Sequence, residues 1–254
     1  MRVPRHVVEA RQARLAELLQ THGYIPISEI CRLTQVSEAT VRRDLEALSR
    51  SRRITRTHGG AMADFNSRFP SFLERQSLNS EGKRAIARQA VSLLSQGMTC
   101  YFDSGTTIHA IASLLREQPV RPLTAVTNNL HVATVLSDID GVRLHMIAGQ
   151  LLPRQAILLG DAACKSVASW QFDIAFIGAE GITHEGIWNT TADVVSLQSV
   201  VARRARLLAV CLDRQKIGMT AQEFLFAMPK TGRLLTDAGP ADLERASIDA
   251  SVLK

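Results

Sequence analysis

The stretch VSEATVRRDL, residues 36–45, decides the fold of the N-terminal part of this chain. Ser37 favours the start of a helix, because its hydroxyl can accept a hydrogen bond from a free N–H group of the first turn. The helix that follows has one apolar face, made by residues spaced i, i+4 and i+7: Val41, Leu45 and Leu48. The pattern predicts a helix that is held against a small core from one side.

The opposite face of this helix is polar and cationic near its N-terminus. Glu38, in the first turn, suits the positive end of the helix dipole. A helix whose apolar face packs on a core and whose exposed face carries polar and cationic groups is suited to entering a DNA major groove. We expect five residues of this segment to contact DNA: Ser37, Glu38, Thr40, Arg42 and Arg43.

The residues upstream complete a DNA-binding unit. Leucines at i, i+3 and i+4 mark the inner face of a helix over residues 7–22, and residues 24–27 favour a short strand. Ser28 is expected to cap a second short helix. Two short helices joined by a turn of a few residues match the helix-turn-helix pattern.

The residues downstream are strongly basic. Residues 50–56 contain four arginines and no acid, residues 54–57 favour a strand, and Gly59-Gly60 favours a turn. This predicts an α+β winged helix-turn-helix, because the second element is a β-wing whose cations meet phosphates. The expected wing contacts are Arg53, Arg56, His58 and Gly59.

A plainer interpretation is that the charged helix is only a solvated face, since short motifs often match by chance. The charge distribution argues against it. Residues 1–61 hold eleven Lys/Arg against six Asp/Glu, a net charge of +5, while the whole chain carries +6. Such asymmetry is typical of a domain that binds a polyanion.

Length and composition indicate the number of domains, the cellular location and the state of the cysteines. A chain of 254 residues suits two domains, for which we expect residues 1–61, a linker over residues 62–79, and residues 80–254. No apolar run is long enough to span a bilayer and no signal segment is evident, so a cytoplasmic protein without membrane partners is expected. The four cysteines lie far apart, which favours free thiols over disulfides or a metal site.

The second domain alternates short apolar strands with helices. This predicts an α/β fold with a mostly parallel sheet covered on both faces. The expected strands are residues 98–102, 123–127, 142–147, 174–177 and 207–212, and the expected helices are residues 82–96, 108–116, 130–136 and 194–206.

Ligands of such sheets bind beyond the carboxyl ends of the strands. Asp103-Ser104-Gly105-Thr106-Thr107 leads from a strand directly into a helix, whose free N–H groups favour an anion. Other strand ends add hydroxyls, amides, carboxylates and a lysine, which suit a phosphorylated polyol. The alternatives are a turn with an N-cap, and for Lys216 and Lys83 ordinary surface lysines.

Taken together, these segments resemble the DeoR family of bacterial transcriptional regulators over residues 6–238. The motifs are residues 36–45 and 54–61, together with 83–87, 102–107, 126–129, 173–178 and 213–218. The resemblance implies a winged helix-turn-helix joined to an effector domain similar to ribose-5-phosphate isomerase. It implies a repressor of sugar or nucleoside catabolic genes that binds operator DNA as a homo-oligomer, dimer or tetramer, and responds to a phosphorylated sugar.

By position in those motifs, the resemblance implies that residues 103–107 hold the phosphate and that four others line the pocket: Thr127, Asn128, Asp213 and Lys216. Lys83 could reach the phosphate. No cofactor, metal or catalytic residue is expected. The rival is a sugar-phosphate isomerase or deaminase with Asp103 or Asp213 as base. The sequence gives only weak support for a dinucleotide-binding site, because no Gly-x-Gly-x-x-Gly motif follows a strand.

Overall fold

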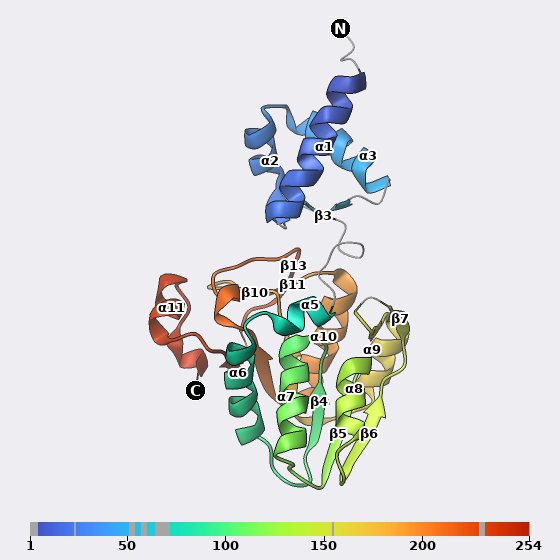
Figure 1. The fold of residues 1–254 in the computed structure, drawn as a ribbon, viewed down its shortest axis with the longest axis vertical. Helices are drawn as coiled ribbons and strands as arrows, with labels where there is room; N and C mark the ends of the chain where they lie inside the picture. The colour runs from blue at the N-terminus through green and yellow to red at the C-terminus, as the bar shows by residue number, and fades with distance from the viewer. Residues whose placement is uncertain are drawn as a thin grey trace. The chain divides into compact units, whose positions relative to one another are not determined.

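The computed structural model describes residues 5–22, 24–50, 54–56, 60–63, 72–153, 155–228 and 232–253. The chain divides into two compact units, Met1–Pro70 and Ser71–Lys254 (Figure 1). Helix α5 (Phe72–Ser77) belongs to the second unit, although it falls in the segment expected to be a linker. No helix among the described residues has the length and apolar character needed to cross a membrane.

The first unit is a winged helix-turn-helix, as predicted. Its elements are α1 (Arg5–His22), β1 (Tyr24–Pro26), α2 (Ile27–Thr34), α3 (Glu38–Arg50), β2 (Ile54–Arg56) and β3 (Gly60–Ala63). The strands pair antiparallel in the order β1-β3-β2, so that β2 and β3 form the wing. The core draws on every helix and includes Leu15, Leu19 and Ile30.

The two helix starts differ in how well they were predicted. Ser37 precedes α3 and its Oγ accepts a hydrogen bond from the N–H of Thr40 at 3.4 Å, as expected of a cap. The prediction for Ser28 was wrong, because the N-cap of α2 is Pro26, two residues earlier, and the helix begins at Ile27. This start buries the side chain of Ile27, and Pro26 has a φ of −61° set by its ring.

The second unit is built on a six-stranded parallel sheet in the order β14-β12-β9-β4-β5-β6. The strands are β4 (Thr99–Phe102), β5 (Leu123–Thr127), β6 (Val142–Met146), β9 (Phe172–Gly178), β12 (Ala205–Cys211) and β14 (Gly232–Leu235). The helices between them are α6 (Ser80–Ser92), α7 (Thr106–Glu117), α8 (Leu130–Ser137), α9 (Asp161–Ala168) and α10 (Ala192–Arg204). The predicted mostly parallel α/β sheet is confirmed.

Each face of this sheet has its own core. Cys100 and Phe102 of β4 point into one core, together with α6, α7 and α8, which lie side by side in Figure 1. Tyr101, between them, points into the other core with α9 and α10. This alternation follows from the two-residue period of a strand, and it explains why the strands are apolar at most positions.

Several elements were missed or misplaced. The helix expected over residues 82–96 ends at Ser92, and the turn after it contains Gly97 with a φ of +84°. A hairpin, β7 (Gln150–Leu152) with β8 (Ile157–Leu159), was not predicted. A second sheet in the order β10-β11-β13 was also missed, with strands β10 (Gly181–Thr183), β11 (Gly186–Asn189) and β13 (Glu223–Phe226). Helix α11 (Pro240–Arg245) follows β14. Two short segments, η1 (Arg214–Lys216) and η2 (Ala250–Leu253), are 3₁₀ helices.

Candidate DNA-binding and effector sites

Helix α3 presents a polar face whose side chains are exposed. Val41, Leu45 and Leu48 are buried, while Arg42 and Arg43 on the other side are exposed. The Arg42 guanidinium donates to Glu38 Oε1 from Nε at 2.9 Å and from Nη2 at 2.6 Å. Both partners are exposed, so this pair contributes little stability.

The start of the same helix forms a small hydroxyl cluster. Ser37 Oγ and Thr40 Oγ1 lie 3.0 Å apart, and Ser37 also caps the helix. The expected α3 contacts therefore share one exposed region at the N-terminal end of the helix. Of the expected wing contacts, Arg56 lies in β2, whereas Arg53, His58 and Gly59 lie outside the described residues.

Asp44 is the residue of α3 that sequence reasoning missed. Its side chain is 3% exposed, and its carboxylate accepts bonds from Arg11 Nε at 2.6 Å, Arg11 Nη2 at 3.1 Å and Gln12 Nε2 at 3.0 Å. The bond from Arg11 to Asp44 raises the pKa of the guanidinium. This ion pair fixes α3 against α1. The only sequence signal was an acid between apolar residues on the buried side.

In the sensor unit, the loop after β4 opens toward solvent at a helix N-terminus. Gly105 is the N-cap of α7 and has a φ of +106°, a conformation that favours glycine. No atom lies within 4 Å of the position that a Cβ would occupy at Gly105. Ser104 and Thr107 are partly exposed beside it, and Thr106, in the first turn, is buried. The N–H groups of the first turn of a helix have no partner within the helix, so the start of α7 is a candidate anion site.

Asp103 ties the same loop to its neighbours. Its carboxyl is 1% exposed, and its Oδ2 accepts bonds from Gln198 Nε2 at 2.6 Å and from the N–H of Gly178 at 3.2 Å. Burial raises the pKa of Asp103 to about 6, although the hydrogen bonds from Gln198, Ser104 and Gly178 oppose this. The side chain thus joins the ends of β4 and β9 to α10.

The loop after β5 is likewise held by its own side chains. Thr127 Oγ1 accepts from the N–H of Asn129 at 3.1 Å, and Asn129 caps α8 by accepting from the N–H of Val132 at 3.0 Å. Asn128 is 1% exposed, and its Oδ1 has no hydrogen-bond partner in the described structure. Such a buried acceptor is costly to leave unpaired, so Asn128 stands out among the polar groups of this loop.

The loop after β12 carries the remaining predicted residues. Asp213 caps η1 by accepting from the N–H of Gln215 at 3.0 Å. Lys216 Nζ donates to the carbonyl oxygen of Ala179 at 2.8 Å and pairs with Glu180 Oε2 at 2.9 Å. These bonds connect the ends of β9 and β12, which are adjacent strands of the sheet.

Lys83 joins this group from α6. It is 5% exposed, and its ammonium donates to the carbonyl oxygens of Arg75 and Leu78. Burial lowers the pKa of Lys83. The carboxylates of Asp213 and Glu180 act to raise this pKa, and the cations of Lys216 and Arg75 lower it further. The Lys83 ammonium is therefore influenced by the charges of four groups, and two of these, Lys216 and Glu180, form an ion pair. We name Lys83 and these four groups the charged cluster: Arg75, Lys83, Glu180, Asp213 and Lys216.

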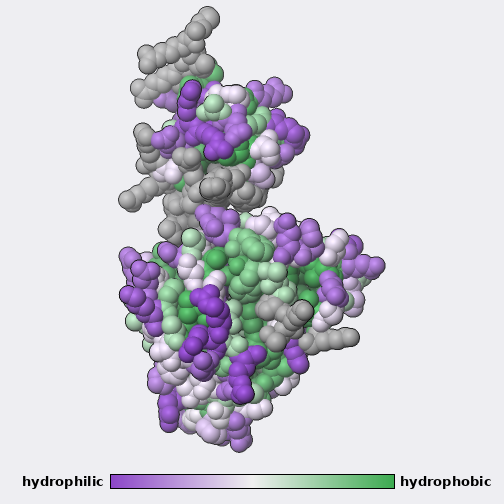
Figure 2. All heavy atoms as spheres, turned by 180° about the vertical axis from the view of Figure 1, so that it is seen from behind, coloured by the Kyte–Doolittle hydropathy of each residue, from purple (hydrophilic) through white to green (hydrophobic). Residues whose placement is uncertain are grey.

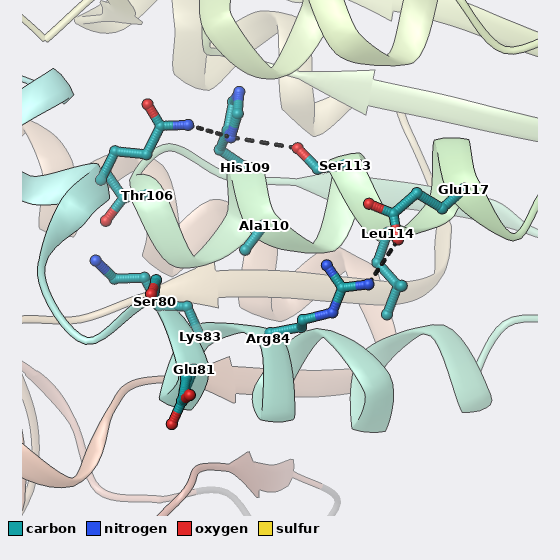
Figure 3. A pocket seen from close by; sticks show the side chains of 11 residues that line it. Ser80, Glu81, Lys83, Arg84, Thr106, His109, Ala110, Ser113, Leu114 and Glu117 are labelled. Carbon is teal, nitrogen blue, oxygen red and sulfur yellow. Dashed lines mark hydrogen bonds and ion pairs between the residues drawn. The ribbon is translucent and has the colours of Figure 1, made fainter.

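A hollow of about 330 Å³ borders the cluster between α5, α6 and α7 (Figure 3). Gln76 of α5, Lys83 of α6 and Thr106 of α7 line it at one end. At the other end Arg84 Nη2 pairs with Glu117 Oε2 at 2.8 Å. The hollow thus adjoins both the first turn of α7 and the cationic side chain of Lys83.

One unit thus presents an exposed polar helix face, and the other contains a candidate anion-binding site. Two family models match this chain. The DeoR C-terminal sensor domain matches residues 78–238, and the DeoR-like helix-turn-helix domain matches residues 11–67. The chain belongs to the DeoR family. It is a transcriptional regulator with a DNA-binding unit and a sensor unit.

Relatives of this DeoR-family regulator match along nearly their whole length. The transcriptional repressor GlcR of Bacillus subtilis (strain 168) is 30% identical over 91% of this chain and 89% of its own length. The glycerol-3-phosphate regulon repressor of Escherichia coli (strain K12) is 29% identical over 91% of each chain. The lactose phosphotransferase system repressor of Lactococcus lactis subsp. lactis is 28% identical over 96% and 97%.

Among solved structures, the chain is similar to ribose 5-phosphate isomerase A from Methanocaldococcus jannaschii. The TM-score is 0.40 and the identity 16%, over 55% of each chain.

Proposed function

We propose that this DeoR-family regulator represses a carbohydrate or nucleoside catabolic operon and that a phosphorylated sugar releases it from DNA. The observation that carries the effector half is the open backbone at Gly105 beside the charged cluster. The repressor assignment is supported by three relatives, each of which is named a repressor.

The DNA-binding half rests on the exposed face of α3. Arg42 or Arg43 can donate two hydrogen bonds to a guanine edge, which contributes about 1–3 kcal/mol of base discrimination. Ser37 and Thr40 offer hydroxyls at the same end of the helix. Glu38 holds Arg42 in the free protein and can accept from a cytosine amino group, so it favours sequence-specific over purely electrostatic binding.

The effector-binding part of the proposal rests on cationic side chains and on polar groups of the strand-end loops. Residues 104–107 supply backbone N–H groups and hydroxyls, while Lys83 and Lys216 supply cations. Asn128 supplies an unpaired amide oxygen for a sugar hydroxyl. Asp103, Thr127 and Asp213 are engaged in bonds within the protein, so their part is to shape the strand-end loops.

We infer that the protein is not an enzyme. An isomerase needs a carboxylate that can reach a carbon next to a carbonyl group. The two candidates, Asp103 and Asp213, are buried and accept hydrogen bonds from the protein. The attached DNA-binding unit also argues for a regulator that acts in the cytoplasm, where its operator lies.

A homo-oligomer is part of this proposal, because one helix-turn-helix reads too few base pairs for useful specificity. Hydrophobic side chains gather on the face of the sensor unit shown in Figure 2. Exposed large apolar residues of this unit include Leu151, Met219 and Phe224. Exposed apolar patches often mark protein interaction surfaces.

A glycine substitution tests the effector site. Gly105→Ala would place a methyl group in the open space before α7 and strain the backbone, so we expect phosphorylated sugars to bind at least about tenfold more weakly, a loss of about 1.4 kcal/mol. Binding is measured by thermal shift and calorimetry with a panel of phosphorylated trioses, pentoses and hexoses.

Gly160→Ala is the matched control. Gly160 also precedes a helix, α9, has a φ of +89° and has no neighbouring atom within 4 Å of the position that a Cβ would occupy. It should lose similar stability while keeping the affinity of the wild type. Equal affinities of the Gly105→Ala variant and the control would contradict the assignment of the site.

A further inference from the structure

The sensor unit has another hollow, beside α11, whose volume is about 510 Å³. This volume suits a small molecule. Three segments meet around it, namely the end of β10, the loop after β12 and α11, and β10 lies beside α11 in Figure 1. None of its lining residues lines the hollow between α5, α6 and α7. The two hollows are therefore separate places on the sensor unit.

The walls of this second hollow are held together by the backbone. The N–H of Gly218 donates to the carbonyl oxygen of Ile182 at 2.8 Å, which ties the loop after β12 to β10. Gly218 has a φ of +78°, and a Cβ at this position would lie 3.5 Å from Cβ of Ala246, so the same loop also approaches the end of α11. The hollow thus has fixed walls.

Two guanidinium groups meet at one carboxylate in the second hollow. Arg245 Nη2 donates to Asp242 Oδ1, and Arg214 Nη2 donates to Asp242 Oδ2 at 3.5 Å. The N–H of Gly239 also donates to Asp242 Oδ2, at 3.0 Å. The bond from Gly239 lowers the pKa of Asp242, and both arginines lower it further. The carboxylate therefore stays charged and keeps the two arginine forks close to each other.

The second hollow keeps one excess positive charge. Two arginines and one aspartate line it, a formal net charge of +1 when His184 is neutral. An arginine has five N–H donors. The hydrogen bonds among the described residues use one donor of the Arg214 guanidinium and two of the Arg245 guanidinium, so most of each fork is available. The side chains of Arg214 and Arg245 are 57% and 76% exposed, so a solute can reach them.

We propose that this hollow is a second anion-binding site and that it takes the phosphate group of a small molecule. The two oxygens of a carboxylate are satisfied by one guanidinium fork, whereas a phosphate group offers three oxygens that two forks can share. His184 adds a ring nitrogen that can donate to the same group. The inference does not depend on the effector site proposed at Gly105.

The loop after β12 connects the second site with the proposed effector site. Lys216 of this loop contacts Ala179 and Glu180 at the end of β9, whereas Arg214, two residues earlier, lines the second hollow. A phosphate group bound to Arg214 therefore touches the loop that also supplies Lys216. This shared loop gives the second site a route by which it can act on the first.

Nuclear magnetic resonance of the full chain tests the proposal, with inorganic phosphate as the probe. Each ¹⁵N-labelled arginine gives one Nε–H signal, which is assigned by substituting that arginine. The signals of Arg214 and Arg245 should shift together and saturate with one Kd. The signal of Arg206 should show no saturating shift, although Arg206 is 83% exposed and also lies 3.5 Å from a carboxylate, that of Asp173.

Three variants locate the site. Arg214→Gln removes one of the two forks, so the Kd read from the Arg245 signal should rise at least about tenfold, or about 1.4 kcal/mol. Arg206→Gln is the matched control, because it removes an exposed, paired arginine outside the hollow, and it should leave this Kd unchanged. Gly105→Ala alters the proposed effector site and should also leave the Kd of the second site unchanged.

Malonate, a dianion with two carboxylates, tests the class of ligand and should bind more weakly than phosphate. Equal or tighter binding of malonate would overturn the assignment to phosphate. Shifts that do not saturate, or a Kd that Arg214→Gln leaves unchanged, would overturn the site itself. A Kd that rises tenfold in Gly105→Ala would mean that both signals report phosphate at the effector loop, which would overturn the second site and leave the proposed function intact.

Discussion

Asp103 shows, at the scale of one residue, how the loop after β4 is held in place. Burial raises its pKa from 3.8 to about 6, so the folded protein holds this proton more tightly than the unfolded chain does. The stability from this proton is fully present below about pH 4 and is lost as the pH rises through about 6. The loss amounts to about 3 kcal/mol.

The variant Asp103→Asn cannot titrate and should therefore lack this dependence. We expect the free energy of unfolding of the wild type to fall relative to that of the variant by about 3 kcal/mol between pH 4 and pH 7.5. Urea denaturation at several pH values measures the difference. Asp140→Asn, at an exposed position, should show a constant difference, and a constant difference for Asp103→Asn would contradict the assignment.

The role of Asp103 illustrates what the sequence alone does not reveal. Its place after an apolar strand predicted a strand-end loop, and the structure has that loop. Its partner Gln198 lies 95 residues further along the chain, and nothing near Asp103 indicates that its carboxyl turns inward to meet it. Similarly, Arg75 lies in a segment whose polar, Pro-broken sequence predicted a linker, yet in the structure it belongs to helix α5.

At the scale of elements, prediction succeeded where the periodic pattern was long. The strands of the parallel sheet are apolar at nearly every position because both faces are covered, and that pattern is visible without a structure. The missed strands β7, β8 and β10 have three residues each, too few for any period to emerge. Their pairing depends on contacts between loops rather than on their own composition.

The packing of α1 against α3 makes a prediction at this scale. Asp44→Ala leaves the guanidinium of Arg11, whose side chain is 18% exposed, without its carboxylate, which should destabilise the DNA-binding unit by about 3 kcal/mol. Far-UV circular dichroism should show an earlier unfolding step. Both tryptophans, Trp170 and Trp188, lie in the sensor unit, so the transition followed by tryptophan fluorescence should not move.

Glu46→Ala provides the control on the same helix. Glu46 is exposed, so its removal should change the free energy of unfolding by no more than about 0.5 kcal/mol. If Asp44→Ala were as mild as Glu46→Ala, the ion pair would not be what positions α3.

At the scale of the whole molecule, the two units divide the work of a regulator. The DNA-binding unit holds nearly all of the excess positive charge, whereas the charges of the sensor unit nearly balance. Because binding to two sites of one protein is linked, an effector that weakens DNA binding must itself bind more weakly to the DNA complex. Neither unit alone can show this linkage.

The most direct test is a fluorescence anisotropy titration of the full chain with the DNA upstream of its own gene, with and without a phosphorylated sugar that raises its melting temperature. We predict that saturating sugar raises the Kd of the wild type for DNA at least about tenfold, or about 1.4 kcal/mol, and that Gly105→Ala needs about tenfold more sugar for the same change. The Arg42→Ala plus Arg43→Ala variant should lose specific binding with or without sugar. A Kd that saturating sugar does not change, or a double variant that binds as the wild type does, would contradict the account.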